Sequence, residues 1–507
     1  MADDPHRRGP GRHRPRGHGL EGRRRAALLP PVPRDRRGGG REAHRQRLHR
    51  ADRQGAPDGV RGRDEPAHRA PDGRQHRVST TTAPAPVWLS ALRSGAAEEL
   101  PNIAMPHFRG TPGWEFTEIP ELDLDAFPTA QTADASIVST VVDDAPRVFD
   151  HLPEGTIRLT QVDHAVVRES AALPDPTAAG KQAIVLPLET AAAEHPDLVE
   201  RYLGRIETAR TPFTARNDRD WVGGFFVYVP RGVTLDAPVL LTLIQDQAGR
   251  SVAPRTLIVL EDGASAEVWS QTTSSSPELE ALVNGVVEIH VGANARLRFV
   301  DVQDLSEKSW IFGAQRATID RDGWVDWITL GLGSAKGKVF QETSLDGAGA
   351  HGRVTGGYAT HGKQHLDFDT LQTHMAPNTT SDLAFRGVLA EKSSTVWRGM
   401  IKVDEKGQQT DAFQESRNLL LGRKSHADNI PGLEIAANDV RCTHAAAIAQ
   451  IDPEQLFYLR SRGLGLNAAR RLVIEGFLAE LVTRFEEGPV REALGEILQR
   501  RMDAVLG

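Results

Sequence analysis

Cysteine is almost absent from this chain, because Cys442 is the only one in 507 residues. A single thiol excludes an intramolecular disulfide, which suits a reducing compartment, and we therefore expect a cytoplasmic location. Long apolar runs are absent as well. No stretch of about 18 apolar residues occurs, so we expect neither a membrane span nor a membrane partner. Hydrophobic residues still make up 39% of the chain, which allows a substantial core and two or three domains.

Motifs that would give the chain a chemistry of its own are also missing. Residues 331–338, GLGSAKGK, come nearest to a phosphate-binding P-loop, but the glycine spacing is wrong and Val339 stands where Ser or Thr is required. ATP hydrolysis would therefore need a partner. Neither H-E-x-x-H nor C-x-x-C occurs, which argues against a zinc or cluster site held by this chain alone.

The first 80 residues lack Lys, Phe, Trp and Tyr but contain 21 Arg against 10 acidic residues, a net charge of +11. Such a composition cannot bury enough apolar surface to fold, so we expect residues 1–80 to be disordered. Clustered arginine would suit a nucleic-acid-binding arm, whereas the acidic residues and the missing apolar segment argue against a targeting peptide. We interpret the segment as translated GC-rich DNA upstream of a start near Val78, and we expect no nucleic-acid partner.

The remaining chain divides by pattern. Residues 86–215 are predicted to form a mixed, mostly helical N-terminal domain, with helices at 86–100 and 190–206. Residues 222–450 contain short β-branched runs broken by Gly, Asp and Asn, which indicate strands. A turn glycine followed by an alternating strand recurs there at intervals of 29, 31 and 24 residues, at Gly263, Gly292, Gly323 and Gly347. This period favours a solenoid or propeller, although spacing alone leaves a sandwich open.

A helical pattern begins after residue 450. Asp452 can cap a helix, Pro453 suits its first position and Gly463 suits its end. Asn467 can cap a second helix, and Gly488 with the following proline separates a third. Residues 451–507 are therefore predicted to form a C-terminal helical domain.

The last predicted strand carries the thiol and a histidine. In VRCTH, alternation puts Val440, Cys442 and His444 on one face. Neighbours two apart on a strand lie roughly 6.5–7 Å apart, so a metal at about 2.3 Å from sulfur and about 2.0 Å from nitrogen could bridge the two side-chain tips. Two ligands do not close a site. The alternative is that Cys442 is a small buried apolar residue and His444 a hydrogen-bonded interior histidine.

Two further sets of residues could carry chemistry. A four-residue spacing on a strand corresponds to about 13 Å, so we interpret His361 and His365, with His374 beyond them, as surface or packing residues rather than metal ligands. Asp367 and Asp369 share a strand face. With Lys402 they are the candidates for an alternative function, a β-helix enzyme acting on polysaccharide. Solvated or turn-binding aspartates are the other interpretation.

Three long segments carry a resemblance to a known family. They cover residues 226–243, 365–403 and 418–464, the last reading NLLLGRKSHADNIPGLEIAANDVRCTHAAAIAQIDPEQLFYLRSRGL. They are similar, in the same order, to segments of the SufB/SufD family, scaffold subunits of the SUF iron–sulfur cluster assembly system. The short element GWEFT at 113–117 resembles a family element too, so the resemblance covers about residue 86 to the end. The missing thiol in 425–429 favours a SufD-type over a SufB-type subunit.

The resemblance implies a mainly β fold, a right-handed parallel β-helix core flanked by N-terminal and C-terminal helical domains. It implies a non-catalytic scaffold that pairs with a SufB-like subunit through its C-terminal β-helix and with a SufC-like ATPase through its C-terminal helices; an isolated copy could also form a homodimer. His444, with Cys442, would be a candidate ligand of a transient iron–sulfur cluster shared with the SufB-like subunit. No nucleotide would bind this chain, and a role for flavin stays open. Where the family usually has His-Gly-Ala-Thr, residues 444–447 read His-Ala-Ala-Ala.

Overall fold

The computed structural model describes residues 77–79, 85–131, 135–149, 151–168, 181–205 and 210–506. Of the Arg-rich segment predicted to be disordered, only Arg77–Ser79 lies among these residues, and it forms strand β1. The other residues of that segment lie outside the described part, so its interpretation stays a prediction. None of the described helices is long and apolar enough to cross a membrane.

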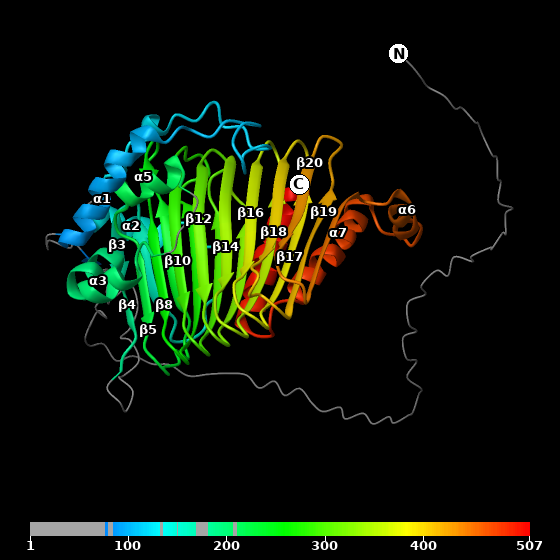
Figure 1. Ribbon diagram of the computed structural model, residues 1–507. Helices are drawn as coiled ribbons and strands as arrows, with labels where there is room; N and C mark the ends of the chain where they lie inside the picture. Colours follow the sequence, from blue (N-terminus) through cyan, green and yellow to red (C-terminus); the bar gives the residue numbers. More distant parts are fainter. Residues whose placement is uncertain are drawn as a thin grey trace, which may run out of the picture. The chain divides into compact units, whose positions relative to one another are not determined.

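The region predicted to be a solenoid coils into two large sheets whose strands alternate along the chain (Figure 1). From β6 onward, neighbouring strands within each sheet are parallel. Strands of the 11-stranded sheet follow the order β1, β3 (Ala165–Arg168), β2 (Ile157–Val162), β6 (Val239–Gln245), β9 (Ser265–Ser274), β11 (Arg296–Asp304), β13 (Trp324–Gly331), β15 (His351–Thr360), β17 (Thr380–Leu389), β19 (Thr410–Leu420) and β21 (Val440–Gln450).

Strands of the 10-stranded sheet follow the order β20 (His426–Ile435), β18 (Ser394–Val403), β16 (His365–His374), β14 (Lys336–Leu345), β12 (Trp310–Ile319), β10 (Leu282–Val291), β8 (Arg255–Leu260), β5 (Phe225–Val229) and β4 (Ile184–Pro187), with β7 (Ser251–Val252) beside β10. This alternating parallel arrangement confirms the predicted parallel β-helix core and rules out the sandwich, which would pair its strands antiparallel.

The turn glycines found in the sequence connect the two sheets. Gly263 has a φ of +68°, a backbone conformation that side chains disfavour. At Gly347 an added Cβ would lie 1.9 Å from the backbone nitrogen of Arg321 in the preceding turn. Glycine is therefore favoured at Gly263 by the positive φ and is required at Gly347 by the close approach of the preceding turn.

Side chains of both sheets fill the interior of the solenoid, here called the bore. Its core contains alternate residues of each strand, such as Leu297 and Phe299 on β11. In the later turns a series of aromatic rings fills the bore, with Phe368 and Phe385 at a centroid distance of 5.6 Å and Phe385 and Trp397 at 6.2 Å. Burial of such large apolar rings is a dominant favourable contribution to folding.

The N-terminal region contains helices and strands. Its helices are α1 (Val87–Glu99), α2 (Ala135–Asp144), α3 (Leu188–Glu194), α4 (Pro196–Tyr202) and α5 (Pro212–Asp220), with short 3-10 turns at Leu100–Asn102 and Leu124–Ala126. The helix predicted at 86–100 is α1. The single helix predicted at 190–206 is wrong, because Pro196 has no N–H to continue α3 and starts α4 instead.

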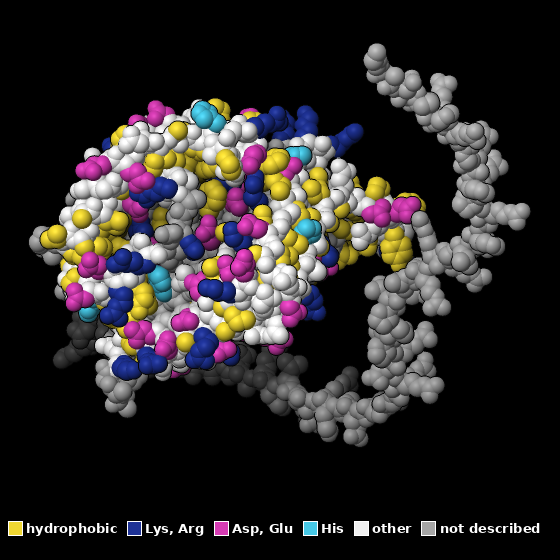
Figure 2. All heavy atoms as spheres, in the orientation of Figure 1, with side chains coloured by type: hydrophobic (Ala, Val, Ile, Leu, Met, Phe, Trp, Pro, Cys, Tyr) yellow, Lys and Arg dark blue, Asp and Glu magenta, His cyan; other side chains and the backbone are white. Residues whose placement is uncertain are grey.

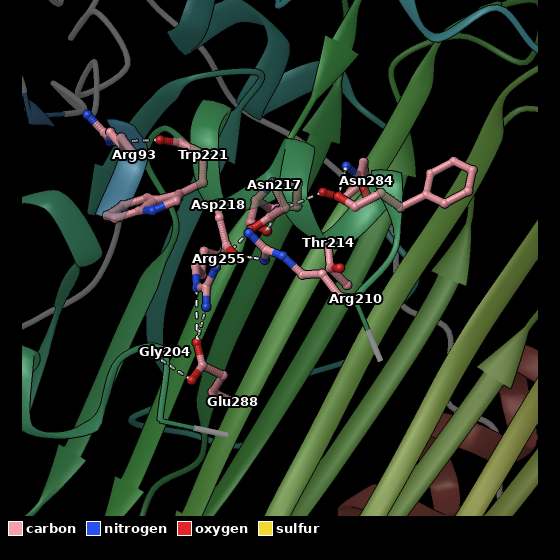
Figure 3. A network of polar contacts seen from close by, with 12 residues as sticks. Arg93, Gly204, Arg210, Thr214, Asn217, Asp218, Trp221, Arg255, Asn284 and Glu288 are labelled. Carbon is pink, nitrogen blue, oxygen red and sulfur yellow. Dashed lines mark hydrogen bonds and ion pairs between the residues drawn. The ribbon is translucent and has the colours of Figure 1, made fainter. Parts of the chain in front are cut away.

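Helix α5 is attached to the 10-stranded sheet by a buried polar network (Figure 3). Arg255 of β8 donates to Glu288 of β10, with an Nη2–Oε1 distance of 2.5 Å, and also to Asp218 of α5. Asn217 donates to the backbone oxygen of Asn284 at 2.8 Å. Burial disfavours the charged form of Arg255, but Glu288 and Asp218 outweigh burial and raise its pKa. The network joins one helix to two strands.

A long connection, residues 103–131, crosses the outer face of the 10-stranded sheet, and we call it the strap (Figure 1, blue loop). Trp114 in the strap stacks on Phe213 of α5 with ring centroids 5.5 Å apart. Lys336 of β14 donates to the backbone oxygen of Glu118 at 2.7 Å. The strap is therefore held by both apolar and charged contacts.

The chain ends in three helices, α6 (Pro453–Ser461), α7 (Leu466–Val482) and α8 (Pro489–Leu506). Asp452 caps α6 as predicted, since its side chain accepts from the N–H of Glu454. The cap predicted at Asn467 is wrong, because the N-cap is Gly465, two residues earlier, and α7 begins at Leu466. Helices α7 and α8 pack on the outer face of the 11-stranded sheet, where Leu494 belongs to the same cluster as Ile328. Helix α6 projects away from the sheets (Figure 1).

Candidate functional site

The solenoid ends at β20 and β21, and no other described strand lies beside their outer edges (Figure 1). Inside a solenoid the next turn covers each inward side chain, but nothing covers those of the last turn. Leu433 and Ile435 on β20 are 38% and 41% exposed, and Ile448 on β21 is 45% exposed. We call this surface the open rim. An unpaired strand edge with exposed apolar side chains is typical of a surface that pairs with another chain.

Cys442 and His444 lie on the open rim. They pair in register with Ala412 and Gln414 of β19, both of which are buried in the bore. The two residues therefore share the inward face of β21, as alternation predicted. Cys442 is half-buried and His444 is exposed. Burial raises the pKa of the Cys442 thiol, and the negative charge of Asp411 raises it further.

These positions bear on the two interpretations of the strand. An exposed His444 does not fit a hydrogen-bonded interior histidine, whereas the half-buried Cys442 is compatible with either interpretation. No group of three or more His, Cys, Asp and Glu that could hold a metal ion occurs in the described ranges. Two donors do not close a tetrahedral site, so the ligand role of Cys442 and His444 stays a prediction.

A polar layer that the sequence analysis missed lies directly below the open rim. Asn418 of β19 accepts from the Tyr358 hydroxyl at 2.7 Å and donates to Asn429 of β20 at 2.7 Å. Ser416 donates to the same Asn429 oxygen at 3.0 Å. Gln414 donates across the bore to the backbone oxygen of Gly399 at 3.1 Å. Alternating polar residues in a buried strand, as in FQESRN, were the available signal. The layer ties β19 to β20 and fixes the strands that carry the rim.

The projecting helix α6 exposes a second apolar surface. Phe457 and Tyr458 are 74% and 56% exposed, and Figure 2 shows hydrophobic side chains gathered on this part of the molecule. A shallow groove here is lined by Phe457, Leu464 and Leu466. The sequence could not decide whether Leu456–Leu459 was core or contact surface, and two of its four side chains face solvent.

The carboxylates of the alternative enzyme hypothesis lie under the strap. Asp367 is 2% exposed and accepts from Lys338, itself 1% exposed, with an Nζ–Oδ2 distance of 2.7 Å. Thr117 of the strap donates to the same oxygen at 2.5 Å. Asp369 shares the outer face of β16 with Asp367, as predicted, and lies 3.8 Å from Lys338. The two acids are therefore occupied by ion pairs beneath a covering segment.

Lys402, the third residue of that hypothesis, lies elsewhere. It pairs with Glu434 at 2.9 Å on the exposed face of β18 and β20. The structure does not bring it together with the two aspartates in a cleft.

The three histidines singled out in the sequence have separate partners. His361 pairs with Glu307 at 2.8 Å, His365 contacts the hydroxyl of Thr117 at 3.0 Å, and His374 lies between two hydroxyl groups inside the bore. They pack as individual polar residues, in agreement with the interpretation made from their spacing.

We expect opposite pH dependences from two neighbours on β16. Burial lowers the pKa of His365 to about 4 and raises the pKa of Asp369 to about 6. The stabilising contribution of His365 is complete above the usual histidine pKa and is lost as pH falls toward 4. That of Asp369 is complete below the usual aspartate pKa and is lost as pH rises through 6. Each amounts to on the order of 3 kcal/mol, so they largely cancel.

Denaturant unfolding between about pH 4 and pH 6.5 would separate the two contributions. In His365→Gln only the Asp369 contribution remains, so the free energy of unfolding should decrease as pH rises, compared with that of the unaltered chain. In Asp369→Asn only the His365 contribution remains, so the free energy of unfolding should increase as pH rises. Variants whose profiles run parallel to that of the unaltered chain would contradict both assignments.

Comparison with known proteins covers most of the described chain. Residues 160–241 match the family described as SufBD protein N-terminal region. Residues 243–477 match the family described as SUF system FeS cluster assembly, SufBD core domain. The second match contains the open rim and most of the solenoid.

Individual relatives agree with these matches. The iron-sulfur cluster assembly protein SufD of Bacillus subtilis is 30% identical over 425 residues, which are 82% of this chain and 94% of that protein. The iron-sulfur cluster assembly protein SufB of the same organism is 28% identical over 292 residues, 57% of this chain and 63% of that protein. A SufBD family protein of Staphylococcus saprophyticus is 26% identical over 406 residues, 78% and 85% of the two chains. The chain belongs to the SufB/SufD family of the SUF system for iron–sulfur cluster assembly.

Proposed function

We propose that this chain is a SufD-type, non-catalytic scaffold subunit that works with a SufB-like subunit and a SufC-like ATPase to assemble and transfer nascent iron–sulfur clusters. The observation that carries the proposal is the open rim, where an unpaired strand edge, bare apolar side chains and the Cys442 and His444 pair occur together. The residues assigned to the polysaccharide-active alternative do not form a catalytic group, because the two acids lie under the strap and Lys402 lies elsewhere.

The open rim suits a partner with the same architecture. A related solenoid can place its own last turn against β20 and β21, which continues both sheets and covers Leu433 and Ile448. Such a partner also brings donors to His444, which this chain leaves exposed. Thiolate is the usual cluster ligand, and imidazole replaces it in some sites. A second copy of this chain would fit the same edge, which is why a homodimer remains an outcome of the experiment.

Helix α6 and the start of α7 suit the ATPase. Their exposed aromatic and aliphatic side chains form a groove on a projecting unit. An apolar groove of this kind is used in helix-in-groove recognition. The groove consists of residues of α6 and α7, whereas the open rim consists of β20 and β21, so the two partners would use different residues of this chain.

Anaerobic co-expression with SufB-like and SufC-like subunits tests the proposal, with the mass of the purified complex as the measurement. We expect one complex that contains all three chains. Recovery of this chain alone or as a homodimer, under conditions where the other two associate, would contradict the partner assignment.

We expect His444→Ala to lower the iron and acid-labile sulfide content of that complex by about tenfold or more, since removing a ligand from a partly shared site weakens metal binding. Cys442→Ala should have a smaller effect if the thiol only supports the histidine. Iron and sulfide analysis after anaerobic purification measures both.

A matched control is His426→Ala. His426 is an exposed histidine on the neighbouring strand β20 and contacts Asp428 at 3.1 Å. It should retain the iron content of the unaltered complex. Equal losses in the His426 and His444 variants would show that the effect does not come from a ligand position.

A further inference from the structure

The bore contains a mainly apolar cavity with a polar corner, far along the chain from the open rim. Its volume is about 70 Å³. On one side it is lined by Ser270 and Asp301, neighbours in register on β9 and β11. On the other side it is lined by Gly285, Gly313 and Gln315 on β10 and β12. We call this cavity the bore chamber. It is large enough for a small ion with several waters, since one water needs about 10–15 Å³ of cavity volume.

Two glycines create the bore chamber. Neither Gly285 nor Gly313 has a positive φ. A Cβ added at Gly313 would come no closer than 3.7 Å to any neighbour, and one at Gly285 would lie 3.5 Å from Pro254. These are ordinary contacts, so backbone geometry does not demand glycine at either position. The missing side chains leave space opposite Asp301 that packing alone would fill.

Asp301 is a half-buried acid that faces the bore chamber and has no basic partner among the residues that line it. Its carboxylate accepts from Gln315, with an Nε2–Oδ2 distance of 2.7 Å, and from Ser270. No Lys, Arg or His lines the bore chamber among the described residues. Burial raises the pKa of Asp301, while the hydrogen bonds from Gln315 and Ser270 favour the ionised form. A buried carboxylate without a cation is costly unless it binds a proton or another positive charge.

Two neighbouring amides on β12 and β14 have buried side-chain atoms without hydrogen-bond partners among the described residues, and one of them, Gln315, lines the bore chamber. The Gln315 Oε1 atom is buried and has no hydrogen-bond partner within the described chain. Gln341 follows Gln315 in register on β14, is 2% exposed, and neither end of its amide has a partner in that same part. Buried amides without partners are rare. A cation in the bore chamber would satisfy the Gln315 oxygen, whereas the Gln341 nitrogen would still need an acceptor.

We propose that the bore chamber binds one monovalent alkali cation, held by the Asp301 carboxylate and by neutral oxygens such as that of Gln315. Oxygen donors suit a hard cation rather than a transition metal. One carboxylate balances one positive charge, whereas a divalent ion would leave a net charge buried in the bore. The cation would neutralise the interior and hold β11 to β12 across the cavity.

Thermal unfolding of the full chain in KCl, NaCl and choline chloride at equal ionic strength tests the proposal. Choline carries its charge on a fully methylated nitrogen, which cannot be coordinated by the Asp301 carboxylate and amide oxygens as an alkali cation can. We expect the Tm to be about 2–4 °C higher in KCl or in NaCl than in choline chloride, because a ligand that binds only the folded state stabilises it. The salt with the larger rise identifies the preferred ion.

Three variants make the result specific. Asp301→Asn keeps the shape but removes the charge, and Gly313→Val fills the cavity, so each should have the same Tm in all three salts. Asp322→Asn, at an exposed turn, should keep the dependence of the unaltered chain. If Gly313→Val does not fold, Gly285→Ala replaces it. Soaking crystals in thallium or rubidium salts should give an anomalous peak beside Asp301.

Equal Tm values for the unaltered chain in all three salts would overturn the proposal, as would an unchanged salt dependence in Asp301→Asn. The bore chamber would then hold water around a protonated acid.

Discussion

Changing Leu433 and Ile448 together to Asp is expected to prevent this chain from co-purifying with a SufB-like subunit, while a SufC-like ATPase still binds. Both side chains lie on the last turn of the solenoid, where no further turn covers them. Placing charges in the middle of an apolar contact leaves them desolvated and unpaired. A loss of about 3–4 kcal/mol corresponds to a decrease in affinity of several hundredfold. Analytical ultracentrifugation of the purified chains measures it.

The control for this variant is Val87→Asp. Val87 is 87% exposed at the start of α1, and an acidic residue is tolerated at a helix N-terminus. It should not change the affinity. If the rim variant assembled normally with the SufB-like subunit, the open rim would not be the pairing surface. If it lost the ATPase as well, the two partners would not bind independently.

Replacing Arg255 with Met is expected to destabilise the chain by about 3–5 kcal/mol, the usual effect of removing one partner from a buried ion pair. The side chains of Arg255 and Glu288 are 5% and 3% exposed, and Asp218 is the third member of the network (Figure 3). Without the guanidinium group, two carboxylates would remain near each other inside the protein. Methionine fills much of the same volume, so the loss of charge should dominate the effect. Urea unfolding measures the free energy.

A matched substitution at an exposed ion pair separates burial from charge. Arg231 pairs with Asp262 at 2.8 Å, but its side chain is 68% exposed. Arg231→Met should therefore change the free energy of unfolding by less than about 1 kcal/mol. Adding Glu288→Gln to Arg255→Met should recover part of the lost stability, since one of the stranded charges is removed. Equal effects at positions 231 and 255 would show that the network does not anchor α5.

Local sequence patterns predicted the elements whose signals are short in range. The caps and breaks around Asp452 and Gly463 depend on a few neighbouring residues, and α6 follows them. The turn glycines recur with the period of the coils, and the strands follow. Patterns of this kind failed where two signals competed. Thr190 to Ile206 has a helical composition, but Pro196 divides it, and Gly465 rather than Asn467 precedes α7.

The partners of buried polar residues could not be predicted in the same way. Asp367 looked like a candidate catalytic carboxylate because the residues that bind it, Lys338 and Thr117, are not its neighbours in the sequence. Those residues are 29 and 250 positions away in the chain. The polar layer under the open rim could not be predicted for the same reason. Asn418 and Tyr358 are hydrogen-bonded but lie 60 positions apart in the sequence.

The sequence by itself determined the repeating strands, the helical tail and the shared face of Cys442 and His444, because strand alternation, turn glycines and helix caps act between near neighbours in the chain. The parallel coil followed from the family resemblance and not from the spacing of the strands. Only the tertiary structure decided that this face opens at an uncovered rim, that the strap buries Asp367 and Asp369, and that Asp301 faces a cavity. Exposure and ion pairing depend on which distant segments pack together, and the coil brings together residues that are about one or more full turns apart in the sequence.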